Sequence, residues 1–444
     1  MKRYVIAGGG VTGLAAAYEL RRREPDATVV VHEASDRLGG KIVTSPFAEH
    51  LVDEGADAFL ARVPWALDLC RELGIDTTLV TPAASKAYVW WDGALRSLPA
   101  GLVLGVPTDL DAVVASGIVD GPLTVHPAGA PLAPGEDVSV GALVRPQLGD
   151  AVFERLVDPL LGGINAGDSD RLSVRAAAPQ LAAAAERDRD LVAGLRALPA
   201  PAPGPIFYAP AGGMGALVDA LAAWLRANRV ELRVGDPAGD VDGIDADGVV
   251  VAVPAPVASR LVRRAAPAAA TILDDIRYSS VALVTLAFDP ADVHRELDGS
   301  GFLVPRTTGL LLTAGSWASS KWAHLAPGTA GRGQVIVRLS TGRFGDDRFT
   351  GLDDGMLVRV MVEELAMTSA IRGEPTEVRV SRWIDAFPQY EPGHLERVDA
   401  IERALAGSTD RVVVAGAALR GIGVPACIRQ GRDAAAALVA RARS

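Results

Sequence analysis

Apolar residues follow two different periods near the start of the chain. Residues 5–7 form a short continuous apolar run, as in a strand that is buried on both faces of a sheet. Apolar residues then recur at helical spacing from Leu14 to Leu20, and a second strand pattern covers residues 28–31. The pattern predicts a strand, a turn, a helix and a second strand, the order of a βαβ unit.

Helical spacing returns in several later segments. Residues 64–74 show it, with Gly74 as a suitable C-cap. Residues 140–161 also show it, up to a glycine-dense segment at 162–167 that predicts a loop with close backbone approach. Further helices are predicted at 176–200, 216–228 and 353–370.

Strand patterns dominate the middle of the chain. Residues 85–110 predict a hairpin with Asp92 and Gly93 in its turn. The continuous apolar run at 249–253, closed by Pro254, is typical of a buried parallel strand. Alternation of apolar and polar residues indicates a mainly antiparallel sheet, with strands at 281–288, 309–314, 334–340 and 378–383.

Composition excludes several classes of partner. The net charge of -10 argues against nucleic acid and against anionic membrane surfaces. No apolar run approaches the roughly 18 residues of a membrane helix, and the chain enters a strand at once, so we expect a cytoplasmic protein. Two cysteines and six scattered histidines predict neither a disulfide framework nor a metal site.

Three glycines, Gly8, Gly10 and Gly13, stand at G-x-G-x-x-G spacing between the first strand and the first helix. The first permits a tight turn, the second lets the backbone approach a pyrophosphate, and the third lets the helix pack on the strand. The helix N-terminus at Val11 and Thr12 then faces the phosphates. The motif in this context predicts a nucleotide site rather than an ordinary βαβ turn.

An acidic residue completes the nucleotide pattern. Glu33, followed by Ala34, ends the second strand twenty residues after Gly13. Its carboxylate can accept both hydroxyls of an adenosine ribose, and its charge disfavours a 2′-phosphate. These residues therefore predict binding of an adenosine diphosphate group.

Two more segments have the composition of a cofactor site. The first would bring one cation and bare backbone to the second side of the pyrophosphate, through Arg37, Gly39, Gly40 and Lys41. The second has small residues where a flat ring could lie against backbone, with a plain polar turn as the alternative, and consists of Gly55, Ala56 and Asp57. A nicotinamide-binding unit does not need the first segment, so a flavin fits better.

The chain closes with a strand at 411–416, a loop at 420–428 and a helix. Pro425 suits the first turn of that helix, whose free N–H groups point out of the loop. A helix N-terminus can stabilise the negative charge of a reduced flavin at N1 and the C2 carbonyl. The alternative is a simple strand-to-helix connection. The contact residues that we predict are Gly416, Gly423, Val424 and Pro425.

Over nearly its whole length the chain resembles the flavin-dependent porphyrinogen oxidases of the flavin amine oxidase superfamily. That family includes protoporphyrinogen oxidase and the coproporphyrin-forming coproporphyrinogen III oxidase of Gram-positive bacteria. The resemblance lies in residues 8–13, 33 and 37–41, shared with amine oxidases, and more specifically in residues 158–168, 172–173, 212–213, 387–390, 393–394 and 420–428.

The resemblance implies an enzyme of heme biosynthesis with non-covalent FAD. It would aromatise coproporphyrinogen III to coproporphyrin III by a six-electron oxidation, with dioxygen as acceptor and hydrogen peroxide as product. No residue is needed as acid or base, and a transient contact with a downstream heme-pathway enzyme is expected. The alternatives are a protoporphyrinogen IX oxidase, an amine oxidase or desaturase, and a non-catalytic binding protein on the same fold.

The same resemblance suggests where substrate binds. A backbone carbonyl at 162–164, with Gly163 preferred, would receive pyrrole N–H groups, with Ile164 and Asn165 beside it. Coproporphyrinogen carries four propionates, so its pocket needs cations. Lys86 and Arg96 are the candidates, each with a solvated surface charge as the alternative reading.

The chain departs from the family pattern between residues 230 and 248. The family usually has a three-stranded meander there, for which this segment is too short. We therefore expect the adenine-side backbone contact near residues 234–238.

These elements predict an α/β protein with a discontinuous Rossmann-like FAD domain and a mixed α+β substrate domain. The FAD domain would comprise residues 1–80, 206–260 and 386–444. Residues 81–205 would form a helical subdomain, and residues 261–385 a mainly antiparallel sheet. The Pro/Gly stretch at 199–205 would cross between domains.

Overall fold

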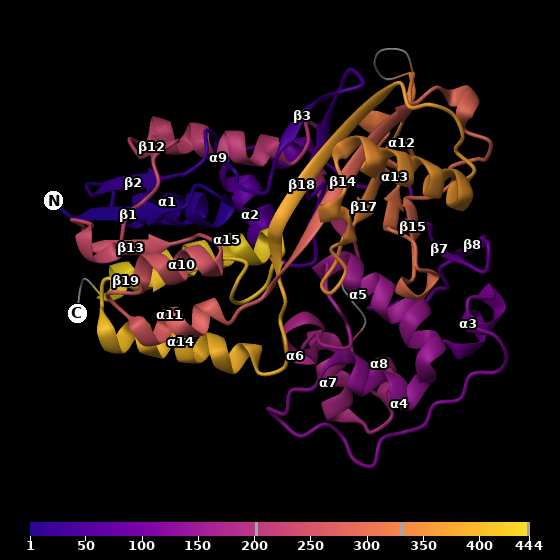
Figure 1. Cartoon of the computed structure of the whole chain (residues 1–444). Coiled ribbons are helices and arrows are strands. Elements are labelled where there is room, and N and C mark those ends of the chain that lie inside the picture. Colours follow the sequence, from indigo (N-terminus) through magenta and orange to yellow (C-terminus); the bar gives the residue numbers. More distant parts are fainter. Residues whose placement is uncertain (200–202, 329–332, 442–444) are drawn as a thin grey trace.

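The computed structural model describes residues 1–199, 203–328 and 333–441. Figure 1 shows three parts: a parallel sheet with helices on both faces, a larger sheet beside it, and a cluster of helices below the larger sheet. This mixed α/β architecture, whose larger sheet is mainly antiparallel, confirms the predicted fold class. Within the described ranges, none of the helices combines the length and apolar character needed to cross a lipid bilayer.

The parallel sheet has five strands, which come from the start, the middle and the end of the chain. All four neighbouring pairs are parallel. The predicted buried strand at 249–253 lies between the strand that is nearest the N-terminus of the chain and the strand that is nearest the C-terminus. In spatial order the strands are β12 (Glu231–Arg233), β2 (Thr28–His32), β1 (Arg3–Ala7), β13 (Gly248–Val251) and β19 (Val412–Val414).

Both faces of this sheet are buried, in two separate cores. Tyr4, Ile6 and Val250 point into one core, whereas Val249 and Val251 point into the other. This explains why the strand sequences are apolar without alternation. Helices on the first face are α1 (Val11–Arg23), α2 (Pro64–Glu72), α9 (Gly215–Ala227) and α15 (Val424–Arg441). Helices on the second are α10 (Ala255–Val262), α11 (Pro267–Asp274) and α14 (His394–Ser408).

The larger sheet has seven strands, and all neighbouring pairs are antiparallel except β15 with β7. Asp92 and Gly93 turn the β7–β8 hairpin with positive φ of 50° and 71°, as the sequence predicts. The spatial order is β18 (Glu377–Pro388), β14 (Tyr278–Phe288), β17 (Val335–Thr341), β16 (Leu312–Ser316), β15 (Gly301–Leu303), β7 (Ala87–Trp91) and β8 (Ala94–Ser97).

The two faces of the seven-stranded sheet differ. Ala282, Val284 and Leu286 of β14 pack in one core with α13 (Asp354–Ser369). The opposite face meets the parallel-sheet part, where Arg338 of β17 donates to Gly55 O at 2.5 Å. The short helix α12 (Ala318–Lys321) follows β16.

The helical cluster differs from the prediction at one place. Gly162 and Gly163 were expected in a loop, but they lie in the last turns of α5, which ends at Asn165 before Ala166 with φ 46°. Glycine costs only about 1 kcal/mol inside a helix, so packing of the buried Leu161 overrides local propensity. The helices of the cluster are α3 (Leu110–Ser116), α4 (Val140–Val152), α5 (Asp158–Asn165), α6 (Val174–Ala177), α7 (Pro179–Arg187) and α8 (Leu191–Arg196).

Short strands join the main parts. They form a hairpin, a three-stranded sheet in the order β5-β11-β6, and a separate pair. Their bounds are β3 (Thr44–Phe47) and β4 (His50–Asp53); β5 (Phe59–Leu60), β11 (Phe207–Pro210) and β6 (Leu79–Val80); and β9 (Leu102–Val103) and β10 (Val106–Pro107).

Packing suggests two changes to the domain boundaries. Helix α11, beyond the predicted limit at 260, packs in the core of the parallel sheet. Strands β7 and β8, within the segment assigned to the helical subdomain, belong to the seven-stranded sheet. We therefore propose a first domain that extends to about residue 276, where Ile276 still packs in that core. Of the predicted crossing at 199–205, residues 200–202 lie outside the described ranges.

Candidate flavin site

The glycine turn after β1 leaves no room for side chains at two of its positions. Gly8 has φ +108°, and a Cβ there would lie 2.4 Å from Ala252 O. A Cβ on Gly13 would lie 1.9 Å from Gly8 O. A Cβ on Gly10, by contrast, would lie 4.0 Å from its nearest neighbour, Gly40 Cα. The first and third glycines thus serve the turn and the helix packing, and the second leaves bare backbone.

Helix α1 begins at this turn with free amide groups. Leu14 N donates to Gly10 O at 3.0 Å and closes the first turn. The N–H groups of the first residues, Val11, Thr12 and Gly13, have no partner within a helix of this geometry. In the described chain no side chain caps this end, and its first turn holds no acidic residue. Such an end favours an anion, in agreement with the predicted pyrophosphate position.

The segment 37–41 lies directly against the glycine turn. Gly39 N donates to Gly9 O at 2.9 Å, and a Cβ on Gly40 would lie 3.2 Å from Gly10 Cα. The exposed Arg37 donates to Gly40 O at 2.8 Å. Lys41 is accessible to solvent, yet the protein around it lowers the pKa of its ammonium by desolvation. That combination is expected for a side chain in a deep recess.

Glu33 stands at the carboxyl end of β2, beside the turn. One carboxylate oxygen accepts from Gly9 N at 2.7 Å, and the other accepts from the N–H and hydroxyl of Ser35, both at 2.8 Å. Ala34 is exposed next to it. The carboxylate therefore links the glycine turn to Ser35, and its contact with a ribose stays a prediction.

The short segment after β12 supplies the neighbours of Glu33 on its other side. Glu33 N donates to Arg233 O at 2.8 Å, and Asp236 N donates to Glu33 O at 2.9 Å. Gly235 N donates to Ser35 O at 2.6 Å. Residues 234–238 thus lie beside Glu33 although the three-stranded meander of the family is absent from the described strands.

Segment 55–57 divides into an open part and a closed part. Ala56 is exposed, and a Cβ on Gly55 would lie 2.5 Å from Lys41 O. The carboxylate of Asp57 instead pairs with Lys321 at 2.8 Å and Arg338 at 3.2 Å, on the side of the seven-stranded sheet. Gly55 and Ala56 therefore stay candidates for a ring contact, whereas the side chain of Asp57 serves the protein.

The C-terminal loop returns to the start of α1. Gly416 has φ +127°, and its Cβ would lie 3.7 Å from Thr12 Oγ1. A Cβ on Gly431 of α15 would lie 2.1 Å from Thr12 O, so α15 crosses α1 at backbone contact. Gly423 is exposed just before α15, while Pro425 is buried in its first turn. The start of α1 therefore packs against α15 about two turns beyond the first residue of α15, and Gly431 is a residue that the sequence pattern did not reveal.

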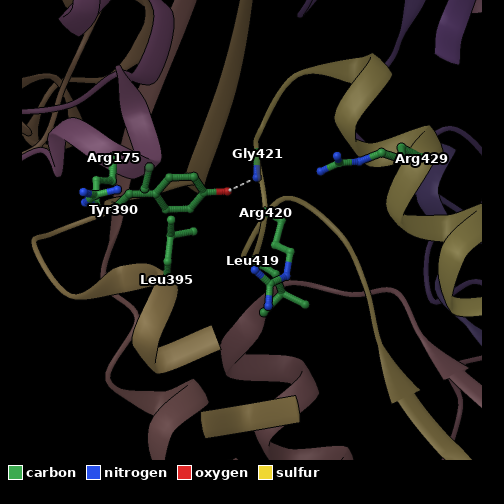
Figure 2. Close-up of a pocket in the computed structure, with 8 residues that line it drawn as sticks. Arg175, Tyr390, Leu395, Leu419, Arg420, Gly421 and Arg429 are labelled. Carbon is green, nitrogen blue, oxygen red and sulfur yellow. Dashed lines mark hydrogen bonds between the residues drawn. The ribbon is translucent and has the colours of Figure 1, made fainter. Parts of the chain in front are cut away.

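Tyr390 and His394 hold this loop in place. Figure 2 shows the hydroxyl of Tyr390, which accepts from Gly421 N at 3.0 Å and donates to Ala417 O at 2.5 Å. His394 stacks on the Tyr390 ring at 3.9 Å and reaches Leu419 O through Nε2 at 2.7 Å. Burial lowers the pKa of His394 to about 4, so the ring is neutral and donates. The family-like segments 387–390 and 393–394 thus act as supports of the C-terminal loop.

A cavity of about 220 Å³ lies beside this support (Figure 2). Its walls include Arg175, which pairs with Glu186, and Arg420, which pairs with Asp399 at 2.6 Å and with Glu402. Both of these cations are engaged by acidic residues, whereas a third arginine of the wall, Arg429, lies over the Trp65 ring at 4.5 Å.

The predicted substrate residues separate into two groups. Gly163 and Ile164 are exposed at the end of α5, where a Cβ on Gly163 would lie 3.5 Å from Leu303 of β15. The buried Asn165 donates to Leu161 O at 3.0 Å. The carbonyls of the last helical turn have no helical partner, which suits them to receive N–H groups.

Lys86 and Arg96 have other surroundings. Lys86 pairs with Asp298 at 2.7 Å on the exposed surface. Arg96 lies against Gly117 at the end of α3, where a Cβ would meet its guanidinium at 2.9 Å. Neither of these contacts places a cation at the end of α5.

Comparison with known proteins agrees with this geometry. The family model described as flavin containing amine oxidoreductase matches residues 11–439. The chain belongs to this family. Two curated relatives are named coproporphyrinogen III oxidase. The one from Bacillus subtilis is 32% identical, over 98% of this chain and 97% of its own. The one from Mycobacterium leprae is 37% identical, over 99% and 98%.

A solved structure from an Exiguobacterium species, provisionally named protoporphyrinogen oxidase, has the same fold. It superposes with a TM-score of 0.85 at 30% identity and covers 100% of this chain and 99% of its own. The resemblance stated from the sequence motifs is thereby confirmed. The family is one of flavin-dependent oxidoreductases, so a flavin is its cofactor.

The residues in place fit a flavin. The backbone around Gly10 is bare, the N-termini of α1 and α15 suit anionic groups, and the exposed Ala56 has a small side chain. Gly423 is exposed with only Pro425 near its missing Cβ, at 3.8 Å. The residues between Glu33 and the start of α15 are therefore compatible with a bound flavin.

Proposed function

We propose that the protein is an oxidase with bound FAD that converts coproporphyrinogen III to coproporphyrin III in heme biosynthesis. Dioxygen would be the electron acceptor and hydrogen peroxide the second product. The observation that carries the proposal is that segment 37–41 packs on the glycine turn while Gly416 and Gly431, on either side of the C-terminal loop, pack on Thr12 at the start of α1. The names of both curated relatives support the choice of substrate.

Each part of the site has a proposed role. Gly8, Gly10, Val11, Thr12 and Gly13 would hold the pyrophosphate. The remaining contacts to FAD would come from Glu33, Ala34, Arg37, Gly39, Gly40, Lys41, Gly55, Ala56, Gly416, Gly423, Val424 and Pro425. When bound, FAD supplies two-electron oxidation, and three rounds balance the six electrons of porphyrinogen aromatisation.

The protein would contribute mainly position and shielding. The N-terminus of α15 at Val424 would stabilise negative charge at the pyrimidine side of the flavin. Carbonyls at Gly163 and Ile164 would receive pyrrole N–H groups and hold a bridge carbon of the substrate toward the ring. No acid or base is required of the protein, because the driving force lies in the substrate and cofactor.

Attachment of FAD would be non-covalent. Cys427, near the predicted ring end, is fully buried, and burial raises the pKa of its thiol to about 11. Burial also raises the pKa of Cys70, to about 12. Neutral, buried thiols are poor nucleophiles, so neither cysteine is suited to a flavin thioether.

Turnover of two porphyrinogens tests the function. Purified protein should show flavin absorbance and release FAD on denaturation. It should form coproporphyrin from coproporphyrinogen III, followed by porphyrin fluorescence, faster than protoporphyrin from protoporphyrinogen IX, with three peroxide molecules per porphyrin by electron count. Preference for protoporphyrinogen IX would overturn the substrate choice. Peroxide release with amines alone would indicate an amine oxidase.

Two further parts of the picture stay predictions. A transient contact with the heme-pathway enzyme that takes the product is expected because porphyrins are poorly soluble and reactive. Cytoplasmic location is expected from the sequence. Co-purification with that enzyme and cell fractionation, respectively, would test them.

A further inference from the structure

We propose that Arg338 of β17 is a positioning residue for the flavin ring. Together with Asp57 and Lys321 it would hold the backbone at Gly55 and Ala56 in the position against which the ring lies. The inference rests on the flavin site of the proposed function, and it deepens that site by assigning it a support from the seven-stranded sheet. Arg338 would act through the backbone of residues 55–56, without touching the cofactor.

The guanidinium of Arg338 bridges two points of one short segment. Nη2 donates to Gly55 O at 2.5 Å, and Nη1 lies 3.2 Å from a carboxylate oxygen of Asp57. The same oxygen accepts from Lys321 Nζ at 2.8 Å and from Trp322 Nε1 at 3.2 Å. Three donors from the sheet domain therefore converge on Asp57, and one of them also fixes the carbonyl two residues earlier.

Neighbouring residues of β18 hold the segment just before this point. Trp383 Nε1 donates to Glu54 O at 2.8 Å, and Ser381 Oγ donates to the Glu54 carboxylate at 2.9 Å. The carbonyls of Glu54 and Gly55 are thus both engaged on the side of the sheet. Residues 54–57 are thus held from one side by residues that are distant in the sequence.

The cluster is buried and its charges are paired. Arg338 is only 7% exposed. Burial alone would raise the pKa of Asp57, yet Lys321 and Arg338 hold that pKa well below its usual range. Removal of one member of a buried charge pair leaves an uncompensated charge, so the arrangement has a strong preference for one geometry.

The segment is open at Ala56, which is exposed. Gly55 itself packs on the Lys41 backbone, where a Cβ would lie 2.5 Å from Lys41 O, so its carbonyl position also sets that of the exposed Lys41. The ring would lie on this open side, and Arg338 on the closed side. Displacement of the Gly55 carbonyl would therefore shift the wall of the ring site and leave the glycine turn at residues 8–13 in place.

The test separates the two ends of the cofactor. In Arg338→Met, the dissociation constant of FAD should rise about tenfold, because a buried partner of Asp57 is lost. The resolved vibronic structure of the bound-flavin absorption band should weaken, as the ring becomes mobile. Binding of ADP to the flavin-free protein should stay within about twofold of the wild type, because the glycine turn is unchanged.

Arg382→Met is the matched control. Arg382 lies in the same sheet, on β18 two strands away, but on the opposite face, where it donates to Leu352 O at 2.7 Å and pairs with Asp354 at 2.8 Å. Its loss should lower the melting temperature and leave FAD affinity and the flavin band unchanged. Arg338→Lys should give an intermediate result, since an ammonium reaches Asp57 or Gly55 O but does not span both in fork geometry.

Two outcomes would overturn the proposal: wild-type FAD affinity and band shape in Arg338→Met, or an equal loss of ADP and FAD binding. If Arg338→Met does not fold, Asp57→Asn serves instead, because it keeps the shape and removes the charge that Arg338 pairs with. Wild-type FAD affinity and band shape in that variant would equally overturn the proposal. These readouts need only flavin binding. Failure of porphyrinogen turnover in a wild type that binds FAD would reject the proposed function and leave this inference standing.

Discussion

The two ends of the proposed flavin site are built by different means. The adenosine end comes mainly from one continuous stretch, residues 8–40, with residues 234–238 beside it, and depends on backbone sterics at Gly8 and Gly13. The ring end is assembled from separate segments near residues 55, 338, 390 and 420, joined by side-chain hydrogen bonds. The adenosine end should therefore lose its FAD affinity when a larger side chain is introduced. The ring end should lose it when a hydrogen-bond partner is removed or a charge changes.

The largest effect is expected from bulk at the adenosine end. In Gly13→Ala the new methyl group would lie 1.9 Å from Gly8 O, where neither helix nor strand can yield. We expect a loss of stability of about 3 kcal/mol or more and no retained FAD. Thermal unfolding and flavin content of the purified protein measure both. Gly407→Ala, in exposed helix α14 with no atom within 4 Å, should be neutral or slightly stabilising.

A change of pH should act on the ring end. His394 has its pKa lowered from 6.5 to about 4, chiefly by burial. Between these values the unfolded chain binds the proton and the folded chain does not, so stability falls as pH drops from 6.5 toward 4. The full effect is roughly 3 kcal/mol as an upper bound.

His394→Gln keeps a donor for Leu419 O but does not titrate. Its free energy of unfolding should depend less steeply on pH between 4 and 6.5 than that of the wild type. Parallel pH dependence in the two proteins would assign the acid sensitivity to other groups.

Removal of one hydroxyl should loosen the C-terminal loop. Tyr390→Phe leaves Ala417 O and Gly421 N without the partner they share, at a cost of about 2 kcal/mol. Because the adenosine end is untouched, FAD should bind more weakly and ADP as before. Titration calorimetry with FAD and with ADP measures both affinities. An equal loss for ADP would show that the two ends are not independent.

The smallest effect is expected from loss of the Glu33 side chain at the adenosine end. Glu33→Ala removes the acceptor of Gly9 N, at 2.7 Å, and the proposed ribose contact. We expect the FAD dissociation constant to rise about tenfold, or about 1.4 kcal/mol, with an unchanged flavin band. Unchanged FAD content after dialysis would move the ribose contact elsewhere.

Local pattern was sufficient wherever a structural reason lies within a few residues. The βαβ unit, the hairpin turn at Asp92 and the strand near 249 are such cases, because periodicity and glycine conformations act locally. The pattern misled at Gly162 and Gly163, since packing of α5 outweighs the propensity of two glycines. It was silent on Arg338 and Gly431, whose partners lie in remote parts of the chain.

The sequence by itself determined that the chain begins with a βαβ unit that has a glycine turn, because its glycines and its strand and helix periods are local facts. Only the tertiary structure decided that Asp57 turns to Lys321 and Arg338, and that α15 touches α1 through Gly431. The physical reason is that ion pairs and close backbone contacts are short-ranged. Which residues come within that range depends on how sheets and helices stack, and the hydrophobic periodicity of the sequence does not reveal that stacking.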